Sequence, residues 1–199
     1  MTDWILELIE RGGYWGIFLL MIIENVFPPI PSEVIMGLGG VAVARGTMSF
    51  WPLLLVGTIG STLGNYVWFM AGERLGYRRL KPLIERWGRV LTVDWEDVER
   101  GTALFRRHGH WIVFALRFSP LLRTIISLPA GLIHMPRVKF LAFTFAGAAV
   151  WNSALILGGQ MAAEFLDTSK TIAEWVIGGM LAATLIAYVW RVVTWKPRG

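Results

Sequence analysis

Four charged side chains interrupt stretches that are otherwise apolar, and they are the residues best suited to chemistry: Glu24, Glu33, Arg117 and Arg123. A charge at the centre of a bilayer costs roughly 2.5–3.5 kcal/mol on insertion scales, so we expect these groups to be paired or hydrated. A planar guanidinium matches phosphate oxygens bidentately, so two arginines at one point form a phosphate clamp. Arg117 and Arg123 therefore predict a site for a phosphate group, with Glu24 and Glu33 as candidate proton carriers.

An alternative hypothesis gives the same four charges a structural role, as salt bridges that lock two hairpins together. Charges that must leave water need a partner, and an ion pair supplies one. The two hypotheses are compatible, because an arginine at a binding site can pair with a glutamate until substrate displaces it. The sequence leaves both open.

The two glutamates bracket a polar, proline-rich interruption, Glu-Asn-Val-Phe-Pro-Pro-Ile-Pro-Ser-Glu. Proline has no N–H donor and disfavours helical geometry in the residue before it, so Pro28 and Pro31 must break any helix here. The apolar runs on either side are each shorter than the roughly 20 residues that a spanning helix needs. Broken backbone at membrane depth is stable only inside protein or beside water. We therefore predict a re-entrant hairpin whose polar tip includes Asn25 and Ser32.

A second interruption has the same character and carries the two arginines, in Arg-Phe-Ser-Pro-Leu-Leu-Arg at 117–123. On a straight helix Arg117 and Arg123 would point in different directions. Pro120 breaks that helix, so both guanidiniums can converge on one tip. Gly131 follows in a Pro-Ala-Gly run, before the next long apolar segment.

Composition places the chain in a membrane. It has 199 residues, of which 55% are hydrophobic and 17% charged, with a mean hydropathy of +0.54. A soluble domain is usually less apolar and more charged. Long apolar segments at about 50–72, 138–161 and 173–193 predict spanning helices, so we expect a polytopic, all-α membrane protein with a single domain, 1–199. The basic stretch at about 73–93 predicts a cytoplasmic loop by the positive-inside rule.

Composition and motifs also argue against several classes of function. The chain has no cysteine, and its three histidines lack the neighbours that a metal site needs, so we expect no metal and no cofactor. It has no hydrolase motif and no phosphate loop, so we do not expect an enzyme. The net charge of +5 comes from basic residues next to apolar segments, where anionic headgroups account for it. We therefore expect no nucleic-acid partner.

The two halves of the chain match each other. Two stretches of the first half align with two of the second: 8–20 with 104–116, and 48–72 with 135–159. We predict two repeats, at about 3–72 and 94–161, each made of an amphipathic helix, a re-entrant hairpin and a spanning helix. Each repeat crosses the membrane once, so the second is expected to be inverted, as in alternating-access transporters.

Small and polar residues inside the spanning segments predict how the helices meet. Asn65 and Asn152 occupy matching positions, and a buried amide needs a partner, so we expect them to cross-link the repeats or to touch a cavity. Gly57, Gly60 and Gly64 share one face of the first spanning helix. Their spacing predicts close helix packing rather than a ligand site.

At these residues the sequence resembles the DedA family, also called the SNARE-associated or VTT-domain family, over about residues 8–160. The resemblance rests on Glu-Asn at 24–25 with Pro-Pro-Ile-Pro-Ser-Glu at 28–33, on Gly-x-x-x-Gly-Asn at 60–65, and on Arg-Phe-Ser-Pro-x-x-Arg at 117–123. The family usually has glycine where this chain has Ser32, and aspartate where it has Asn65. This chain departs from the family pattern at both positions.

The resemblance implies a bacterial inner-membrane protein that moves lipids between leaflets and depends on the proton motive force. Undecaprenyl phosphate and phosphatidylethanolamine are the implied substrates. The essential acidic pair of the family corresponds to Glu24 and Glu33, and its essential basic pair to Arg117 and Arg123.

We therefore expect a flippase-like or scramblase-like transporter for an anionic, phosphate-bearing lipid, with undecaprenyl phosphate as the first candidate and protons as the coupling ion. Three alternatives stay open. They are a phosphatidylethanolamine translocase or scramblase, a proton-coupled transporter of a small anion, and an assembly factor that transports nothing. The sequence does not fix the oligomeric state, and a homo-oligomer is one option.

Overall fold

The computed structural model describes residues 2–26, 32–91, 95–118 and 126–166, together with the single positions 123 and 186. The helices in chain order are α1 (Thr2–Val26), α2 (Ser32–Ala44), α3 (Phe50–Leu91), α4 (Trp95–His108), α5 (Trp111–Leu116), α7 (Ser127–Leu132) and α8 (Arg137–Leu166). Every regular element within these residues is a helix, so the predicted all-α class is confirmed. The final transmembrane helix predicted at about 173–193 lies outside the described residues, as do Pro28, Pro31 and Pro120.

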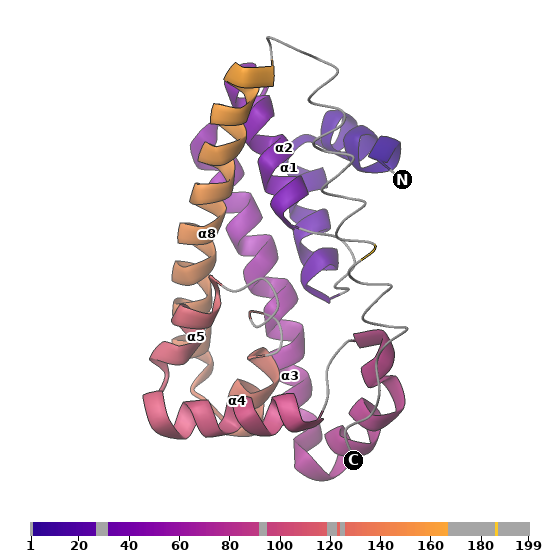
Figure 1. The fold of residues 1–199 in the computed structure, drawn as a ribbon, viewed down its shortest axis with the longest axis vertical. Helices are drawn as coiled ribbons and strands as arrows, with labels where there is room; N and C mark the ends of the chain where they lie inside the picture. Colours follow the sequence, from indigo (N-terminus) through magenta and orange to yellow (C-terminus); the bar gives the residue numbers. More distant parts are fainter. Residues whose placement is uncertain are drawn as a thin grey trace.

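Two of the described helices are long and apolar enough to cross a membrane. They are Phe50–Pro82 within α3 and Arg137–Ala163 within α8. Both run along the long axis of the bundle (Figure 1). Their positions agree with the spanning helices predicted at about 50–72 and 138–161.

The stretch predicted as a loop at about 73–93 is helical as far as Leu91, which corrects that prediction. α3 changes direction at Gly76, where φ is 62°, a left-handed value that glycine adopts without strain. The chain then resumes as a helix because Leu80 and Ile84 bury their side chains against Val98 of α4. On which side of the membrane this segment lies stays a prediction.

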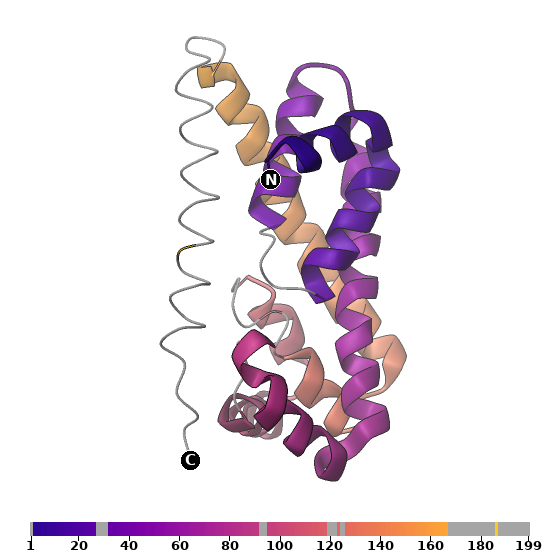
Figure 2. The ribbon, with the colours of Figure 1, turned by 90° about the vertical axis from the view of Figure 1, so that its right-hand side faces the viewer.

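Two helices lie across the bundle, one at each end (Figures 1 and 2). The first is the start of α1, which turns at Gly13, where φ is 51°. The second is α4, at the opposite end. Gly13 ends the first helix, since glycine takes this backbone conformation without the strain that a side chain would add.

Short helices form the two hairpins predicted from the interrupted segments. The apolar part of α1, Gly12–Val26, and α2 are both shorter than a membrane span. They enter from one end of the bundle, and α5 and α7 lie toward the other end, beside α4 (Figure 1). The chain therefore breaks near the middle of the bundle in both halves.

Each hairpin contacts both long helices. α1 packs on α3 and α5 packs on α8, so the first helix of each hairpin contacts the long helix that follows it in the chain. α2 packs on α8 and α7 packs on α3, so the second helix contacts the long helix of the other half. Two matching units would make these contacts. Their inversion across a membrane stays a prediction.

Where the two halves meet, glycines allow the backbones of neighbouring helices to approach closely. A Cβ atom on Gly131 of α7 would lie 2.1 Å from the carbonyl oxygen of Phe69 in α3. In the other half, a Cβ atom on Gly159 of α8 would lie 2.1 Å from the carbonyl oxygen of Gly37 in α2. No residue larger than glycine fits at either position without moving the helices apart.

The predicted packing role of the α3 glycines is also confirmed. A Cβ atom on Gly60 would lie 2.7 Å from the carbonyl oxygen of Phe18, and one on Gly64 would lie 2.8 Å from that of Ile22. Both carbonyls belong to α1. α1 therefore packs closely on α3 just before the acidic tip.

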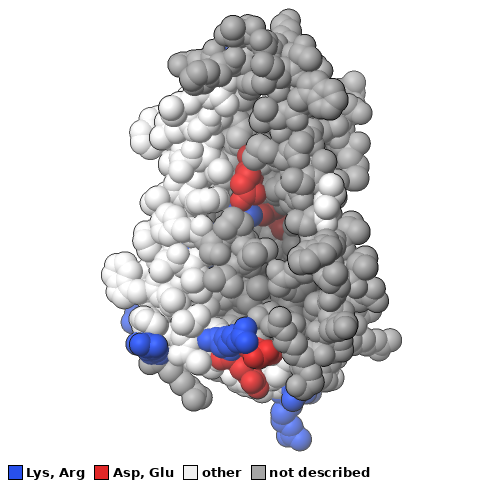
Figure 3. All heavy atoms as spheres, viewed as in Figure 1, with Lys and Arg blue, Asp and Glu red and all other residues white. Residues whose placement is uncertain are grey.

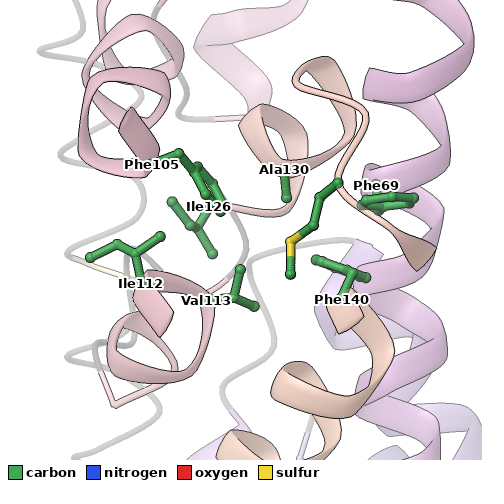
Figure 4. Packing of buried hydrophobic residues seen from close by; sticks show 8 residues of the cluster. Phe69, Phe105, Ile112, Val113, Ile126, Ala130 and Phe140 are labelled. Atoms are coloured by element: carbon green, nitrogen blue, oxygen red, sulfur yellow. The ribbon is translucent and has the colours of Figure 1, made fainter. Parts of the chain in front are cut away.

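An apolar cluster fixes the second hairpin (Figure 4). Its members come from α3, α4, α5, α7 and α8 and from short connections, and they are Phe69, Phe105, Ile112, Val113, Ile126, Ala130, Met135 and Phe140. The rings of Phe69 and Phe140 stack, with centroids 4.4 Å apart. Burial of this many apolar groups holds α5 and α7 against the long helices. The cluster thereby positions Arg117, which directly follows α5.

Candidate functional site

The tips of the two hairpins meet at Arg123. Its Nη2 donates to the carboxylate of Glu24, and its Nη1 donates to the hydroxyl of Ser32 at 2.6 Å. Nη1 also lies 3.9 Å from Oε1 of Glu33, within the range of an ion pair. The structure therefore joins both predicted acids and Ser32 to one of the two predicted arginines.

The two acids differ in their access to the surroundings. The Glu24 side chain is 4% exposed and the Arg123 side chain is 9% exposed, so this pair is enclosed by protein. The Glu33 side chain is 24% exposed. In Figure 3 acidic atoms, with a basic atom beside them, are visible about midway along one face of the molecule. Glu33 is therefore the more accessible carboxylate of the site.

Arg117 is held by neutral groups. Nη1 donates to the carbonyl oxygen of Arg123 at 2.9 Å, and Nη2 donates to the hydroxyls of Thr144 at 2.9 Å and Ser127 at 3.3 Å. The guanidinium carbon lies 5.9 Å from the centroid of the Phe140 ring, within cation–π range. Within the described part of the chain, no carboxylate forms an ion pair with Arg117.

Asn25 and Asn65 connect the acidic tip to the second hairpin. Asn25 Nδ2 donates to Glu24 at 2.5 Å, and Asn65 Nδ2 donates to Asn25 Oδ1 at 2.5 Å. Ser127 Oγ then donates to Asn65 Oδ1 at 3.1 Å. All three polar side chains are fully buried, so each depends on these partners. Asn65 thus cross-links the two halves of the chain, which was one of the two expectations for it, and it does so beside the charged residues.

Two other predicted supporting residues lie away from the charges. Asn152 of α8 donates to the Thr58 hydroxyl of α3 at 3.3 Å, so it cross-links the two long helices, as one of our two expectations had it. Gly131 allows α7 to approach α3 closely and makes no polar side-chain contact. Both residues support the frame and are not part of the polar site.

Sequence reasoning missed Ser127 and Thr144. Both are hydroxyl side chains on apolar helices, and such residues often bond only to the carbonyl of their own helix. One weak signal was present, because Ser127 follows Arg123 by about one helical turn. Thr144 had no comparable signal in the sequence.

Both guanidiniums keep an unused donor. The buried Nε atoms of Arg117 and Arg123 have no hydrogen-bond partner in the described structure, and neither does Oε1 of Glu33. Buried polar atoms are rarely left unpaired, so each such atom calls for an explanation. A phosphate group can accept hydrogen bonds from two guanidiniums, which would satisfy both donors. In the same residues, no group of His, Cys, Asp and Glu side chains is arranged to hold a metal ion.

The chain was then compared with known proteins. The family model described as "VTT domain" matches residues 30–161. An "Alkaline phosphatase-like protein" of Lactococcus lactis subsp. lactis is 33% identical over 95% of this chain and 92% of the relative. "Undecaprenyl phosphate transporter A" of Staphylococcus aureus is 35% identical over 80% of this chain and 79% of that protein.

A protein of the same name from Bacillus subtilis is 28% identical over 95% of this chain and 92% of that relative. No solved structure matches the chain significantly. The family match covers well over half of the chain and includes Glu33, all of α3, most of α8 and both arginines. This chain therefore belongs to the VTT-domain family of membrane proteins, the DedA family.

Proposed function

We propose that this protein is a multi-pass transporter of the bacterial inner membrane that moves undecaprenyl phosphate between the two leaflets. One observation carries the proposal. Among the described residues, Arg117 is buried and donates to neutral acceptors, beside a second arginine, and the Nε atom of each guanidinium has no hydrogen-bond partner. This arrangement is suited to a phosphate group, which brings the negative charge that Arg117 lacks.

The two acids can compete with a phosphate group for Arg123. Arg123 is bound by Glu24 and lies close to Glu33, so an incoming phosphate must compete with them for the guanidinium. Protonation of an acid removes that competitor. Protons would in this way be coupled to headgroup binding, while the prenyl tail remains in lipid and only the headgroup needs a polar path.

The long helices and the broken hairpins support alternating access as the transport mechanism. Transporters with inverted repeats bind substrate near the membrane midplane, where broken helices meet. Here the charged tips of both hairpins meet near the middle of the bundle (Figure 1). We propose that the two units are inverted copies that rock about this point.

The names of the relatives bear on substrate and reaction. Two relatives are named undecaprenyl phosphate transporters, and the substrate we propose follows from them. Another is named alkaline phosphatase-like. We propose transport without hydrolysis, because the assembled groups hold a phosphate and none is placed as a nucleophile beside a base.

The experiment is leaflet exchange in proteoliposomes, with labelled undecaprenyl phosphate and labelled phosphatidylethanolamine measured side by side. The double variant Arg117→Ala/Arg123→Ala is compared with a control variant, Arg100→Ala, which removes an exposed arginine of α4 that pairs with Glu96. We expect exchange of the phosphate lipid to be lost in the double variant and kept in Arg100→Ala.

Three other results would contradict the proposal. Equal movement of both lipids would indicate a scramblase that does not read the headgroup. Release of inorganic phosphate would indicate an enzyme. Exchange of neither lipid, with or without a proton gradient, would leave the small-anion transporter and the assembly factor as the remaining hypotheses.

A further inference from the structure

Six residues of the site form a closed ring of hydrogen bonds. The ring passes from Arg117 through Ser127, Asn65, Asn25, Glu24 and Arg123. It closes where Arg117 Nη1 donates to the carbonyl oxygen of Arg123, at 2.9 Å. The ring joins the acid of the first hairpin to the arginine of the second by two independent routes.

The bonds on the longer route all point the same way. Arg117 Nη2 donates to Ser127 at 3.3 Å, and Ser127 donates to Asn65 at 3.1 Å. Asn65 donates to Asn25 at 2.5 Å, and Asn25 donates to Glu24 at 2.5 Å. The series of donors therefore ends on a carboxylate. This direction fits the ionised form of Glu24, which accepts and cannot donate.

The charged groups around Glu24 are few. Arg123 donates to its Oε1, and Asn25 donates to its Oε2. Glu33 is the other acid near this point, because it lies within 3.9 Å of the same Arg123 guanidinium. Arg117 is two hydrogen bonds away from Glu24 around the ring, by way of Arg123. Among the described residues, Arg123, Glu33 and Arg117 are thus the charged groups whose fields reach Glu24.

Protonation changes Glu24 from a group that only accepts hydrogen bonds into one that must also donate one. A protonated carboxyl has one O–H donor, so one of its oxygens must stop accepting and find an acceptor. Asn25 can supply one if its amide turns over and presents Oδ1, a change that gives up the bond from Asn25 Nδ2 to the Met21 carbonyl at 2.8 Å and, for Asn65, the bond to the Ser61 carbonyl at 2.9 Å. The Asn25 amide nitrogen then faces Asn65, whose amide must turn in the same way. The reversal reaches Ser127, whose hydroxyl no longer donates to Asn65 and becomes available to another acceptor.

We propose that Asn65 and Ser127 are positioning residues that transmit the protonation state of Glu24 to Arg117. When Glu24 is charged, the ring orients every donor toward it and Arg117 is retained by the ring. When Glu24 is neutral, the Ser127 hydroxyl is released beside Arg117, where it can donate to a bound phosphate. Only hydrogen-bond direction passes along the amides, and the proton itself stays on Glu24. This inference rests on the proposed function and names the regulation of its site.

The first test measures binding of undecaprenyl phosphate to purified protein over a series of pH values. Asn65→Leu removes the amide, and Asn152→Leu is the matched control, since Asn152 is the corresponding buried amide of α8 outside the ring. After correction for the ionisation of the lipid phosphate itself, which has a second pKa of about 6, we expect wild type and Asn152→Leu to share a pH dependence that approaches tenfold per pH unit, the limit for one titrating group. Asn65→Leu should bind with a shallower profile, in which only the direct competition between Glu24 and the phosphate for Arg123 remains.

Two further variants keep the test decisive if Asn65→Leu folds poorly. Ser127→Ala removes one hydroxyl from the ring and should flatten the profile in the same way. Glu24→Gln fixes a neutral side chain, so adding Ser127→Ala to it should change nothing further in the pH profile. A profile that keeps its wild-type shape in Ser127→Ala, with affinity lowered equally at every pH, would overturn the proposal.

A second readout does not depend on lipid binding. The infrared band of the protonated carboxyl that disappears in Glu24→Gln reports when Glu24 takes up its proton. Asn65 orients the Asn25 amide that donates to Glu24, so Asn65→Leu should weaken that hydrogen bond. We expect the midpoint of this band to move by roughly one pH unit, the effect of weakening one hydrogen bond to the acid. Asn152→Leu should leave it in place, and equal midpoints in all three proteins would refute the ring. If wild type binds no phosphate lipid while the midpoint moves as expected, the proposed function fails and the link between Glu24 and Asn65 stands.

Discussion

The Arg123 guanidinium donates to the Glu24 carboxylate, which lies 99 residues earlier in the chain. Both side chains are more than nine-tenths buried, so this contact fixes the relative position of the two hairpins. This ion pair agrees with the hypothesis that the charges lock the hairpins together. It also leaves Arg123 where a phosphate could replace Glu24 as its partner. The predictions that follow separate these two roles.

Removing one member of the pair should destabilise the protein more than removing both. Arg123→Gln leaves Glu24 buried without its partner, and breaking a buried ion pair typically costs about 3–5 kcal/mol of the free energy of unfolding. The double variant Glu24→Gln/Arg123→Gln leaves no such charge, so we expect part of that stability to return. Unfolding in detergent, followed by circular dichroism, measures the cycle. Glu73→Gln is the control, since Glu73 pairs with the exposed Arg137. Additive effects of the two substitutions would show that the pair is not coupled.

Glu33→Gln should separate folding from transport. The Glu33 side chain is 24% exposed, and its Oε1 makes no hydrogen bond, so the fold depends little on its charge. We expect an unfolding midpoint close to that of wild type, together with loss of the proton dependence of transport. The measurements are thermal unfolding and lipid exchange with and without a proton gradient. A loss of folded protein as large as that of Arg123→Gln would support the structural hypothesis instead.

Thr144→Val should reduce transport while the protein stays folded. The substitution keeps the shape of the side chain and removes the hydroxyl that accepts from Arg117 Nη2. Hydrogen bonds to charged groups contribute roughly 1.5–3 kcal/mol, so we expect the exchange rate to fall at least several-fold. Ser153→Ala is the matched control on the same helix, because within the described residues that hydroxyl bonds to the Ala149 carbonyl one turn earlier. Equal rates in the two variants would remove Thr144 from the site.

Two adjacent glycines of α8 should respond very differently to alanine. A Cβ atom at Gly159 would meet the Gly37 carbonyl oxygen at 2.1 Å, whereas one at Gly158 would meet nothing within 4 Å. We expect Gly159→Ala to lower the free energy of unfolding by about 1–3 kcal/mol, as overpacking does. Gly158→Ala should be neutral or stabilise the helix by up to about 1 kcal/mol. Thermal unfolding of the two purified variants tests this, and similar values would contradict the close approach of α2 and α8.

Much of the frame and the centre of the site could be predicted from the sequence. Charges inside apolar segments are costly, so Glu24, Glu33, Arg117 and Arg123 were visible without any knowledge of the fold. Helix length and proline placement predicted the spans and the hairpins for the same reason, because a membrane permits few alternatives. The prediction of the glycine contacts rested on their spacing along one helix face.

The parts that were missed depend on contacts between distant segments. Ser127 and Thr144 are cheap to bury when they bond to their own helix, so nothing in the sequence distinguished them from structural hydroxyls. The helix after Gly76 was missed because its basic residues suggested a loop, while Leu80 and Ile84 find their partner only in α4. Asn65 and Asn152 looked equivalent, and only the fold shows that one meets Asn25 and the other Thr58.

The second helix of each hairpin packs on the long helix of the other half, and this has a consequence for how the protein is made. α2 packs on α8 through glycine backbone contacts, yet α8 is synthesised about a hundred residues after α2. Until the second half enters the membrane, α2 has its contacts with α1 and α3 but lacks its main partner α8, and Glu24 lacks Arg123. The first half of the chain is therefore an incomplete assembly during translation. Its packing is completed only when the second half enters the membrane and the contacts of α2 with α8 and of α7 with α3 form.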